Sequence, residues 1–415
     1  MPVKLCAGKK FNNEANTARI PGFLNMRLHT KYHASIEEIG AQEWAELDLR
    51  GDPFVSLAFL AAAERHRAVS ARLGWHPRHA ALRDDAGQLV GVLPLYLRTH
   101  SFGDFSRDWN WPAAFEQHGI RYYPKLVSGI PYTPATGPRF LVRRGMERTP
   151  VVRQLIAAAL DGAREFGCSS WQCLFVEEEA CAALTQSGLL MRRGCQFHWR
   201  NRGYRDFDEF LAGFSSEKRK KVKRERRRIA ESGLRLEVLH GDAISPGLWK
   251  DIYPHYLSTF ERYGNHAAFP PEFFPDVSKG LGRGLVVFLA WEGTRVVAAA
   301  ICYRSDTTLF GRHWGAEGDY HSLHFELCLY QGIEYCIRNG LSRFEPGAQG
   351  EHKVSRGFLP EPTWSAFWIA DPGMRRMIAD YLVREQAAMV SYQDEMAEHA
   401  PYRDAAILAS EELRP

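Results

Sequence analysis

The fold class of this 415-residue chain is determined by one stretch, residues 285–345, which reads LVVFLAWEGTRVVAAAICYRSDTTLFGRHWGAEGDYHSLHFELCLYQGIEYCIRNGLSRFE. Short runs rich in Val, Ile, Leu and aromatic residues, typical of strands, come before a longer run with helical periodicity. The predicted elements are three strands, a helix and a further strand: Leu285–Trp291, Val296–Tyr303, Thr307–Trp314, Leu323–Asn339 and Ser342–Glu345. An antiparallel hairpin followed by a strand, a helix and a strand predicts an α/β fold (α+β, with mixed sheets).

The first half of the chain repeats this order of elements. DDAG, residues 84–87, is a hairpin turn signal between two predicted strands. The predicted elements of this half are Ser56–Val69 (helix), Pro77–Arg83, Gln88–Leu97, an extended run over 125–142, Pro150–Phe166 (helix), Ser169–Phe175, Glu177–Ser187 (helix) and Cys195–Asn201. The repeat predicts two tandem lobes, 35–205 and 206–400, with an N-terminal arm, 1–34, and a C-terminal tail, 401–415.

Composition excludes several classes of protein. Hydrophobic residues make up 45% of the chain and charged residues 25%, which is typical of a globular protein and excludes a disordered chain or a collagen. The longest apolar runs have strand length, so no membrane span is expected. The N-terminus lacks the apolar region of a secretion signal, and the eight Cys form no C-x-x-C pair. These features predict a soluble, cytoplasmic protein with reduced cysteines.

Positive charge is concentrated in one predicted helix. Between Glu217 and Arg228 there are nine Lys or Arg and two Glu, a local charge of +7 against +4 for the whole chain. A charged run is usually a solvated helix face, but this density favours contact with phosphate or RNA. No zinc finger, RNA-recognition motif or KH loop is present, so no DNA partner is expected. The predicted tRNA- or phosphate-binding residues are Lys218, Lys220, Lys221, Arg224, Arg227 and Arg228.

The densest polar cluster lies between Gly311 and Arg356. Buried charges are costly unless they are paired, so such a cluster is typical of a salt-bridge network or of a functional site. His321, His324 and Glu326 lie close together, but they do not form the H-E-x-x-H pattern of helical zinc sites. No metal site is therefore expected.

Two further regions are candidate binding walls. GAQGEHK, residues 347–353, is a glycine-spaced turn that is suited to hold phosphate or carboxylate with backbone N–H groups, although it lacks P-loop spacing. Residues 108–115 and 122–140 combine aromatic residues and prolines and predict either a rigid groove wall or a loop that covers a sheet. The predicted substrate-binding residues are Asp108, Trp109, Tyr123, Lys125, Thr133, Thr136, Arg139, Arg312, His313, Trp314, Gln331, Gln349, Glu351, His352, Lys353 and Arg356.

From about Ser35 to Glu385 the sequence resembles the FemAB-like family of predicted N-acyltransferases. The resemblance rests on the strings PFVSLAFLAAAE, GWHPRH, GVLPLYLRTHSFGDF, YYPKLVSGIPYTPATGPR, RKKVKRERR, GRHWG, HFELCLYQGIEYCI and FEPGAQGEHKVSRGF. It implies two lobes of the GNAT acyltransferase type in one chain. The sequence departs from the family pattern at Phe367, at Leu329 and at Ala113 or Ala114, so no catalytic role is expected for those positions.

The resemblance also implies the reaction, which is attack of an amine on an activated acyl carbonyl. Such a reaction needs a base for the amine proton, and His324, Glu326 and Glu345 are the predicted catalytic residues. No cofactor is expected beyond the acyl donor. The CoA-binding loop of GNAT enzymes is degraded here over Arg312–Gly318, whereas the basic helix corresponds to a K/R-rich segment of Fem-type relatives. This comparison favours an aminoacyl-tRNA donor over acyl-CoA.

Alternatives from other classes remain open. A non-catalytic module that binds a nucleotide or acidic ligand predicts tight binding without acyl transfer. A metal-dependent hydrolase predicts stoichiometric metal and loss of activity with a chelator. The amine acceptor, whether a small molecule or a peptide, is not specified by the sequence.

Overall fold

The computed structural model describes residues 27–262, 264–348 and 350–404. The strands are β1 (His29–His33), β2 (Leu47–Asp48), β3 (Trp75–Pro77), β4 (His79–Arg83), β5 (Leu89–Leu93), β6 (Tyr96–Arg98), β7 (Lys125–Ser128), β8 (Leu141–Arg143), β9 (Ser170–Val176), β10 (Leu190–Arg200), β11 (Arg235–His240), β12 (Leu285–Glu292), β13 (Arg295–Arg304), β14 (Thr308–Ala316), β15 (Arg343–Glu345) and β16 (Leu359–Ile369).

The α-helices are α1 (Ala41–Ala45), α2 (Leu57–Arg65), α3 (Trp111–Gln117), α4 (Arg148–Glu165), α5 (Glu178–Gln186), α6 (Phe207–Ala212), α7 (Ser216–Glu231), α8 (Pro246–Arg262), α9 (Phe273–Leu281), α10 (Leu323–Phe325), α11 (Gln331–Asn339) and α12 (Pro372–Glu398). Three shorter elements matter below: the 3-10 helix η2 (Pro53–Val55), the π-helical turn η6 (Glu326–Tyr330) and the 3-10 helix η7 (Glu351–Arg356).

The described strands form two sheets with mixed pairing. One has the order β1-β4-β5-β8-β2 and the other the order β11-β12-β13-β14-β15-β10-β16-β9-β7-β6-β3. Most neighbours are antiparallel, but β7 pairs with β9 and β14 pairs with β15 in parallel, and a helix precedes the second strand of each pair. The prediction of an α/β fold with mixed sheets is confirmed.

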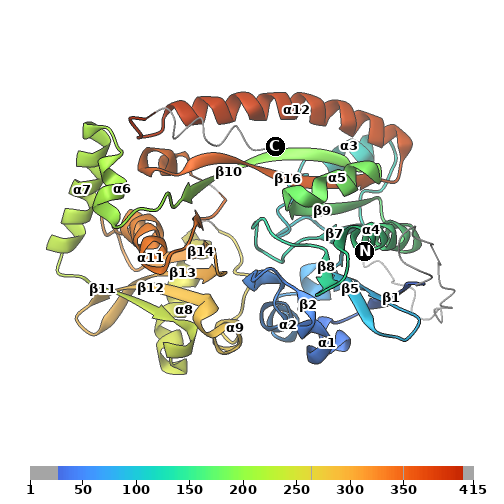
Figure 1. Cartoon of the computed structure of the whole chain (residues 1–415), viewed down its shortest axis with the longest axis horizontal. Helices are drawn as coiled ribbons and strands as arrows, with labels where there is room; N and C mark the ends of the chain where they lie inside the picture. The colour runs from blue at the N-terminus through green and yellow to red at the C-terminus, as the bar shows by residue number, and fades with distance from the viewer. Residues whose placement is uncertain (1–26, 263, 349, 405–415) are drawn as a thin grey trace.

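The two lobes exchange strands. β16 lies between β9 and β10 and pairs with both in antiparallel register, although β16 belongs to the predicted second lobe, 206–400. β10 also pairs with β15, at Trp199 with Phe344 and Arg200 with Arg343. In Figure 1, α12 runs along β10 and β16 and covers both parts of the molecule. Strands from the two sides of the predicted boundary at 205/206 are therefore interleaved in one sheet.

Aromatic packing also joins the lobes. The ring of Phe54, in η2, lies 5.1 Å from that of Tyr303 and 5.2 Å from that of Phe310. Phe59, in α2, packs edge-on against Phe273 of α9 at 5.5 Å. All five side chains are buried in one hydrophobic cluster. Burial of this much aromatic surface between the lobes makes them a single packed unit.

Several elements differ from the sequence-based predictions. The predicted helix Leu323–Asn339 contains the π-helical turn η6, which residue periodicity does not reveal. The turn-rich segment 102–123 contains α3, which begins at a tryptophan followed by proline. The extended run 125–142 is regular strand only at its ends, β7 and β8, because its prolines interrupt the ladder. Most of the predicted arm and tail, 1–26 and 405–415, lies outside the described residues.

In the described residues, no helix is long and apolar enough to cross a membrane.

Candidate functional site

The second lobe opens where β14 and β15 separate. These strands pair in parallel over only three residues each, Thr308–Phe310 with Arg343–Glu345. β14 continues to Ala316, while the chain after Glu345 turns away through Pro346 and Gly347. The end of a parallel strand pair, with a helix entering beside it, is a common place for a ligand site. Four of the predicted site residues meet at this opening.

These four residues are Trp314 of β14, His324 of α10, and His352 and Lys353 of η7. The ring of His324 lies 5.4 Å from that of Trp314 and 5.8 Å from that of His352. The Lys353 ammonium donates a hydrogen bond of 2.8 Å to the carbonyl oxygen of Gly347. The structure thus brings residues from three separate segments into one cluster.

Burial makes the basic groups of this cluster unusually weak bases. Together with the neighbouring His352, Lys353 and Arg356, burial lowers the pKa of His324 to about 4. It lowers the pKa of Lys353 to about 7 and also depresses the pKa of His352. The two histidines are therefore largely uncharged near neutral pH, and Lys353 loses its proton within the neutral range.

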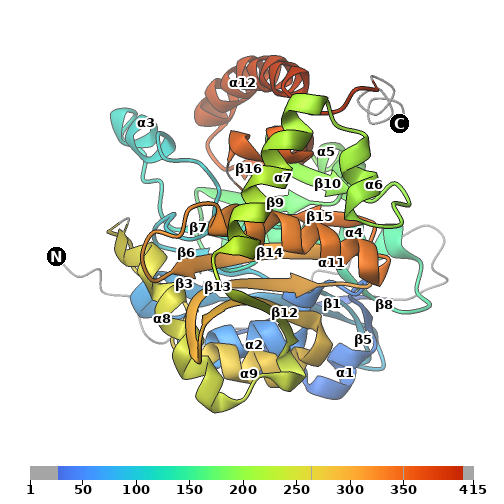
Figure 2. The same ribbon diagram turned by 90° about the vertical axis from the view of Figure 1, so that its left-hand side faces the viewer.

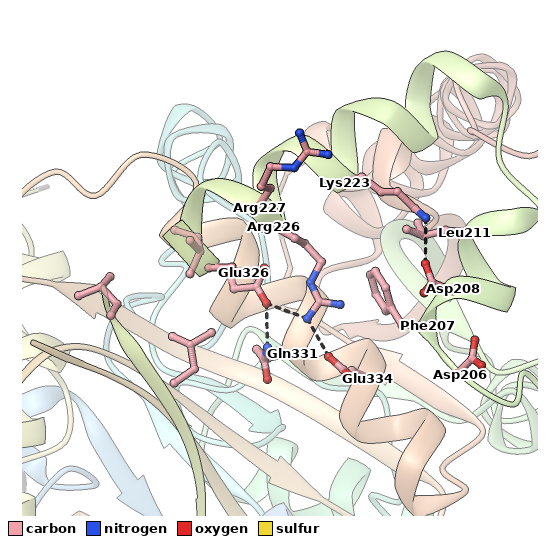
Figure 3. Close-up of a pocket in the computed structure, with 14 residues that line it drawn as sticks. Asp206, Phe207, Asp208, Leu211, Lys223, Arg226, Arg227, Glu326, Gln331 and Glu334 are labelled. Carbon is pink, nitrogen blue, oxygen red and sulfur yellow. Dashed lines mark hydrogen bonds and ion pairs between the residues drawn. The ribbon is translucent and has the colours of Figure 1, made fainter. Parts of the chain in front are cut away.

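Glu326 lies on the other side of the same helix and lines a surface pocket of about 650 Å³ (Figure 3). The pocket lies between α6, α7, β11 and the helix that begins with η6. The Oε1 atom of Glu326 accepts hydrogen bonds from Gln331, at 2.7 Å, and from Arg226, at 3.1 Å. Its Oε2 atom is buried and has no hydrogen-bond partner among the described residues. Burial raises the pKa of Glu326, against the opposing effect of Arg226.

The π-helical turn η6 begins at Glu326. A π turn widens the helix locally and is found most often at functional sites. It accounts for the contact between Gln331 and Glu326, which are five residues apart. A carboxylate with one bonded and one free oxygen, in a pocket that raises its pKa, has the properties of a general base.

Helix α7 has two distinct faces. Its inner face holds Val222, Glu225 and Ile229, which are buried. Glu225 accepts a hydrogen bond of 2.8 Å from Arg356 of η7, and another from the hydroxyl of Tyr330 in η6. The helix is thereby tied to both segments that carry the candidate site residues.

Arg226, the next residue on α7, pairs with Glu334 at 2.8 Å as well as with Glu326. Its guanidinium also lies over the ring of Phe207, at 4.4 Å. Figure 2 shows α7 running across the helix that carries Glu334. A change in the position of α7 would therefore change the hydrogen bonding of Glu326.

The outer face of α7 carries five of the six predicted phosphate-binding residues, and all five are exposed. The sixth, Lys218, lies in the first turn, four residues before the buried Val222, and is half-buried. Within the described residues, none of the six lies within ion-pair distance of a carboxylate. The full set is Lys218, Lys220, Lys221, Arg224, Arg227 and Arg228. Six unpaired cations on one helix form a strongly positive surface.

Glu345 and Arg312 lie together between the lobes rather than in the pocket of Glu326. Arg312 Nη2 lies 3.6 Å from Glu345 Oε2, and both side chains are buried. The Arg312 guanidinium also lies 5.2 Å from the ring of Phe54 in the first lobe. Two N–H groups of Arg312 and the Oε2 atom of Glu345 have no hydrogen-bond partner in the described chain.

The predicted residues of the first lobe are mostly buried in its interior. Lys125 is fully buried and its ammonium lies 2.5 Å from Asp108 and 2.9 Å from Asp104. Arg139 and Thr133 donate hydrogen bonds to nearby backbone carbonyls. These groups form a satisfied internal network. A sequence pattern of polar and proline residues does not separate such a network from a groove wall.

The remaining predicted residues are dispersed. Tyr123 lies 2.9 Å from the hydroxyl of Ser101, and the Thr136 hydroxyl is buried without a hydrogen-bond partner in the described chain. Trp109 is exposed. The others are His313, packed among the rings of Tyr256, Phe269 and Phe274; Glu351, bonded to Tyr392; and Gln349, which lies outside the described residues.

The structure adds site residues that the sequence analysis did not identify. Glu225 and Arg226 link α7 to the site, and Glu334 shares Arg226 with Glu326. The sequence carries a signal for the first two, because Val222 and Ile229 stand seven residues apart and mark the buried face of α7. In the part of the chain that the structure describes, no group of three or more His, Cys, Asp or Glu could hold a metal ion.

Comparison with known proteins assigns the family. A family model named FemAB-like, described as peptidoglycan biosynthesis/recognition, matches residues 35–404. No curated protein matches the sequence. Similar solved structures include the C-terminal domain of a putative lysylphosphatidylglycerol synthetase from Agrobacterium fabrum, with 11% identity and a TM-score of 0.49. That similarity covers 82% of this chain and 96% of the other.

FemX is similar at 12% identity and a TM-score of 0.47, over 76% of this chain and 93% of its own. A tandem GNAT protein from the clavulanic acid pathway is similar at 14% identity and a TM-score of 0.42, over 83% and 99%. Because the family model spans most of the chain, this protein belongs to the FemAB-like family and is an acyltransferase.

Proposed function

We propose that this protein transfers an aminoacyl group from aminoacyl-tRNA to an amine acceptor and so forms an amide bond. The observation that carries the proposal is the two-faced helix α7. Its outer face presents five unpaired cations to solvent, and its inner face contacts Glu326 through Arg226. The same helix thus offers a surface for a polyanionic donor and a direct link to the candidate base.

The donor fits the chemistry of the outer face. A tRNA backbone presents a series of phosphates, and each contact with Lys or Arg releases counterions and contributes to affinity. Five of the six cations are exposed, so they are available to phosphate without breaking an internal ion pair. A single small phosphate compound would use only one or two of them.

The reaction itself exchanges one ester for one amide. The acceptor nitrogen attacks the aminoacyl carbonyl, a C–N bond forms, and the C–O bond to the ribose oxygen breaks. The proton lost by the nitrogen goes to Glu326, whose free Oε2 faces no competing donor in the described chain, and Glu326 then returns this proton to the ribose oxygen, which leaves as a hydroxyl group. Holding the amine and the carbonyl in contact supplies much of the rate.

In the alternative arrangement in which His324 is the base, the cluster of His324, His352 and Lys353 would bind the uncharged acceptor amine. Because burial lowers the pKa of each of these groups, the cluster does not repel an amine as a set of full positive charges would. Lys353 is already oriented by its hydrogen bond to Gly347. His324 and Glu345 remain alternative bases in this proposal.

The decisive experiment measures binding of charged tRNA over a series of salt concentrations. The test variant changes Lys218, Lys220, Lys221, Arg224, Arg227 and Arg228 to Gln. The matched control changes six exposed cations elsewhere to Gln: Lys31, Arg67, Arg121, Lys250, Lys279 and Arg283. In the test variant alone, we expect the slope of log affinity against log salt to flatten by about 0.7 to 0.9 for each phosphate that the variant no longer neutralises.

Equal weakening of both variants would show that net charge, rather than α7, is responsible, and would contradict the proposal. Absence of tRNA binding by the wild-type protein at low salt would exclude this donor. Acyl-CoA would then be the donor to test, by the same transfer assay with an amine acceptor.

A further inference from the structure

The pocket of Glu326 meets the basic surface of α7 at one residue. Among the side chains that line this pocket, Lys223, Arg226 and Arg227 come from α7 and carry positive charge. Of the six predicted phosphate-binding residues, all of which the structure describes, Arg227 alone belongs to this lining. Its side chain is exposed. Arg227 therefore belongs both to the pocket and to the outer face of α7.

Helical geometry places the other charged residues in order around α7. Successive residues of an α-helix are about 100° apart, so Lys220 lies about 20° from Arg227 on the helix surface. Arg228 lies about 100° from Arg227 on the side away from the pocket, and Arg226 lies about 100° away on the pocket side. Figure 3 shows the Arg226 guanidinium turned into the pocket and that of Arg227 turned outward. Glu231, four residues after Arg227, is an exposed acid, so the row of cations ends at Arg227.

The sign of the charge changes at this mouth of the pocket. The acids that line the pocket are Asp206, Asp208, Glu326 and Glu334. Asp208 pairs with Lys223 at 3.0 Å, and Glu334 pairs with Arg226 at 2.8 Å. Asp206 accepts a hydrogen bond of 2.8 Å from the backbone N–H of Glu209. Glu326 keeps one buried oxygen, Oε2, without a partner in the described chain. Acids are therefore in excess inside the mouth, and cations outside it.

An aminoacyl-tRNA has the same order of charges at its reactive end. Its phosphates are negative up to the one that precedes the terminal nucleoside. The aminoacyl ester beyond that nucleoside carries an α-amino group, which is positive when it is protonated. The pocket volume of about 650 Å³ lies in the range of small-molecule sites, and its apolar wall includes Phe207, Leu211 and Leu236. A nucleoside with its amino acid thus matches the pocket in polarity, and the phosphate before it matches the mouth.

We propose that Arg227 binds the last phosphate of the donor and thereby holds the terminal nucleoside and its aminoacyl group in the pocket of Glu326. Lys220 continues the row from Arg227 toward the start of α7. Lys221 and Arg228, which lie farther around the helix, contact phosphates that are more distant from the aminoacyl end. This inference rests on the proposed function and adds to it the position of the reactive end of the donor.

The test measures binding of a minimal donor analogue by isothermal titration calorimetry. The analogue is 3′-amino-3′-deoxyadenosine with glycine attached through a stable amide, prepared with and without a 5′-phosphate. Glycine has no side chain for the pocket to select. We expect the wild-type protein to bind the phosphorylated form about tenfold or more tightly than the other, because a charge-assisted hydrogen bond to the phosphate is gained.

Arg227→Gln should bind both forms of the analogue equally, and Arg227→Lys should restore much of the preference for phosphate. Arg228→Gln is the matched variant, because it removes an exposed guanidinium from the next position of α7. It should weaken binding of intact charged tRNA, as Arg227→Gln does, but keep the wild-type preference for the phosphorylated analogue. Unaltered thermal unfolding would verify that the variants fold.

Two results would overturn this inference and leave the proposed function in place. One is binding of charged tRNA by the wild-type protein without any preference for the phosphorylated analogue. The other is a preference that Arg227→Gln retains, or that Arg227→Gln and Arg228→Gln lose equally. Absence of binding of charged tRNA at low salt would instead contradict the proposed function itself.

Discussion

At the scale of single residues, Glu326 and Arg226 are the pair on which the proposed chemistry depends. Glu326 is buried with one free oxygen, and Arg226 holds the other. Desolvation raises the pKa of the carboxylate, while the guanidinium lowers it. This balance sets the fraction of ionised base at a given pH.

Replacement of Glu326 by Gln is expected to reduce the rate of aminoacyl transfer by about 10² or more, because the amide accepts no proton. Binding of tRNA should be unchanged, since Glu326 does not lie on the outer face of α7. The measurement is enzyme-dependent release of the aminoacyl group from charged tRNA in the presence of an amine. Glu334→Gln, which alters the same pocket, should keep nearly normal activity; equal activities of the two variants would remove Glu326 from the reaction.

Replacement of Arg226 by Gln is expected to move the acidic limb of the pH–rate profile to higher pH. The guanidinium lowers the pKa of Glu326, so its removal raises that pKa and leaves less ionised base at neutral pH. The profile of kcat/KM for the wild type and variant checks this. An activity loss of the same size at every pH would show that Arg226 has only a structural role.

Lys353 makes the stability of the protein depend on pH. Burial lowers its pKa to about 7 in the folded protein, from 10.5. Between about pH 7 and pH 10.5, Lys353 is protonated in the unfolded chain but not in the folded protein. The contribution of Lys353 to the free energy of unfolding therefore rises with pH. Lys353→Met should remove this rise, as measured by urea unfolding at about pH 7 and about pH 9. Lys279→Met, at an exposed site, should leave this rise unchanged. If Lys353→Met has the same pH dependence as the wild type, Lys353 is not the group responsible.

At the scale of elements, the packing of α8 against β14 depends on a glycine. A Cβ atom on Gly315 would lie 1.6 Å from the carbonyl oxygen of His255, in the backbone of α8. The two elements therefore approach more closely than any side chain allows. This approach fixes the position of the strand that leads into the opening between β14 and β15.

Gly315→Ala is expected to destabilise the protein by about 1–3 kcal/mol or more, because the helix must move away from the strand. The free energy of unfolding from urea titration measures this effect. Gly247→Ala is the control, since its Cβ would meet only the Ser245 hydroxyl at 3.7 Å, an ordinary contact. A loss of less than about 0.5 kcal/mol in Gly315→Ala would show that α8 is not held this closely.

At the scale of the whole molecule, the exchange of β16 makes each lobe incomplete alone. β10 pairs with β16 along most of its length, from Leu190 to His198, and β16 also pairs with β9. A fragment of residues 35–205 lacks β16 and leaves the edges of two buried strands unpaired. Unpaired buried backbone groups and exposed apolar strands are strongly unfavourable.

We therefore expect the fragment 35–205 to be unfolded or aggregated, as judged by circular dichroism and size-exclusion chromatography. The full chain should unfold in a single cooperative transition, because both lobes share the sheet and the aromatic cluster around Phe54. A soluble, cooperatively folding fragment would contradict this expectation.

The sequence alone determined the class of fold, the family and the basic helix. Strand and helix periodicity are local properties, so the elements of residues 285–345 and the N-cap and stop of α7 follow from residues that are close in the chain. The family resemblance was confirmed over residues 35–404. The local density of nine cations required no knowledge of the fold.

Only the tertiary structure decided which polar residues share a site. Lys125 and Lys353 look alike in sequence, yet one is neutralised in a core network and the other stands at the opening of two strands with a lowered pKa. The exchange of β16 and the contacts of Glu326 with Arg226 and Gln331 likewise depend on the tertiary structure. Desolvation and ion pairing are set by such contacts, and sequence periodicity does not encode them.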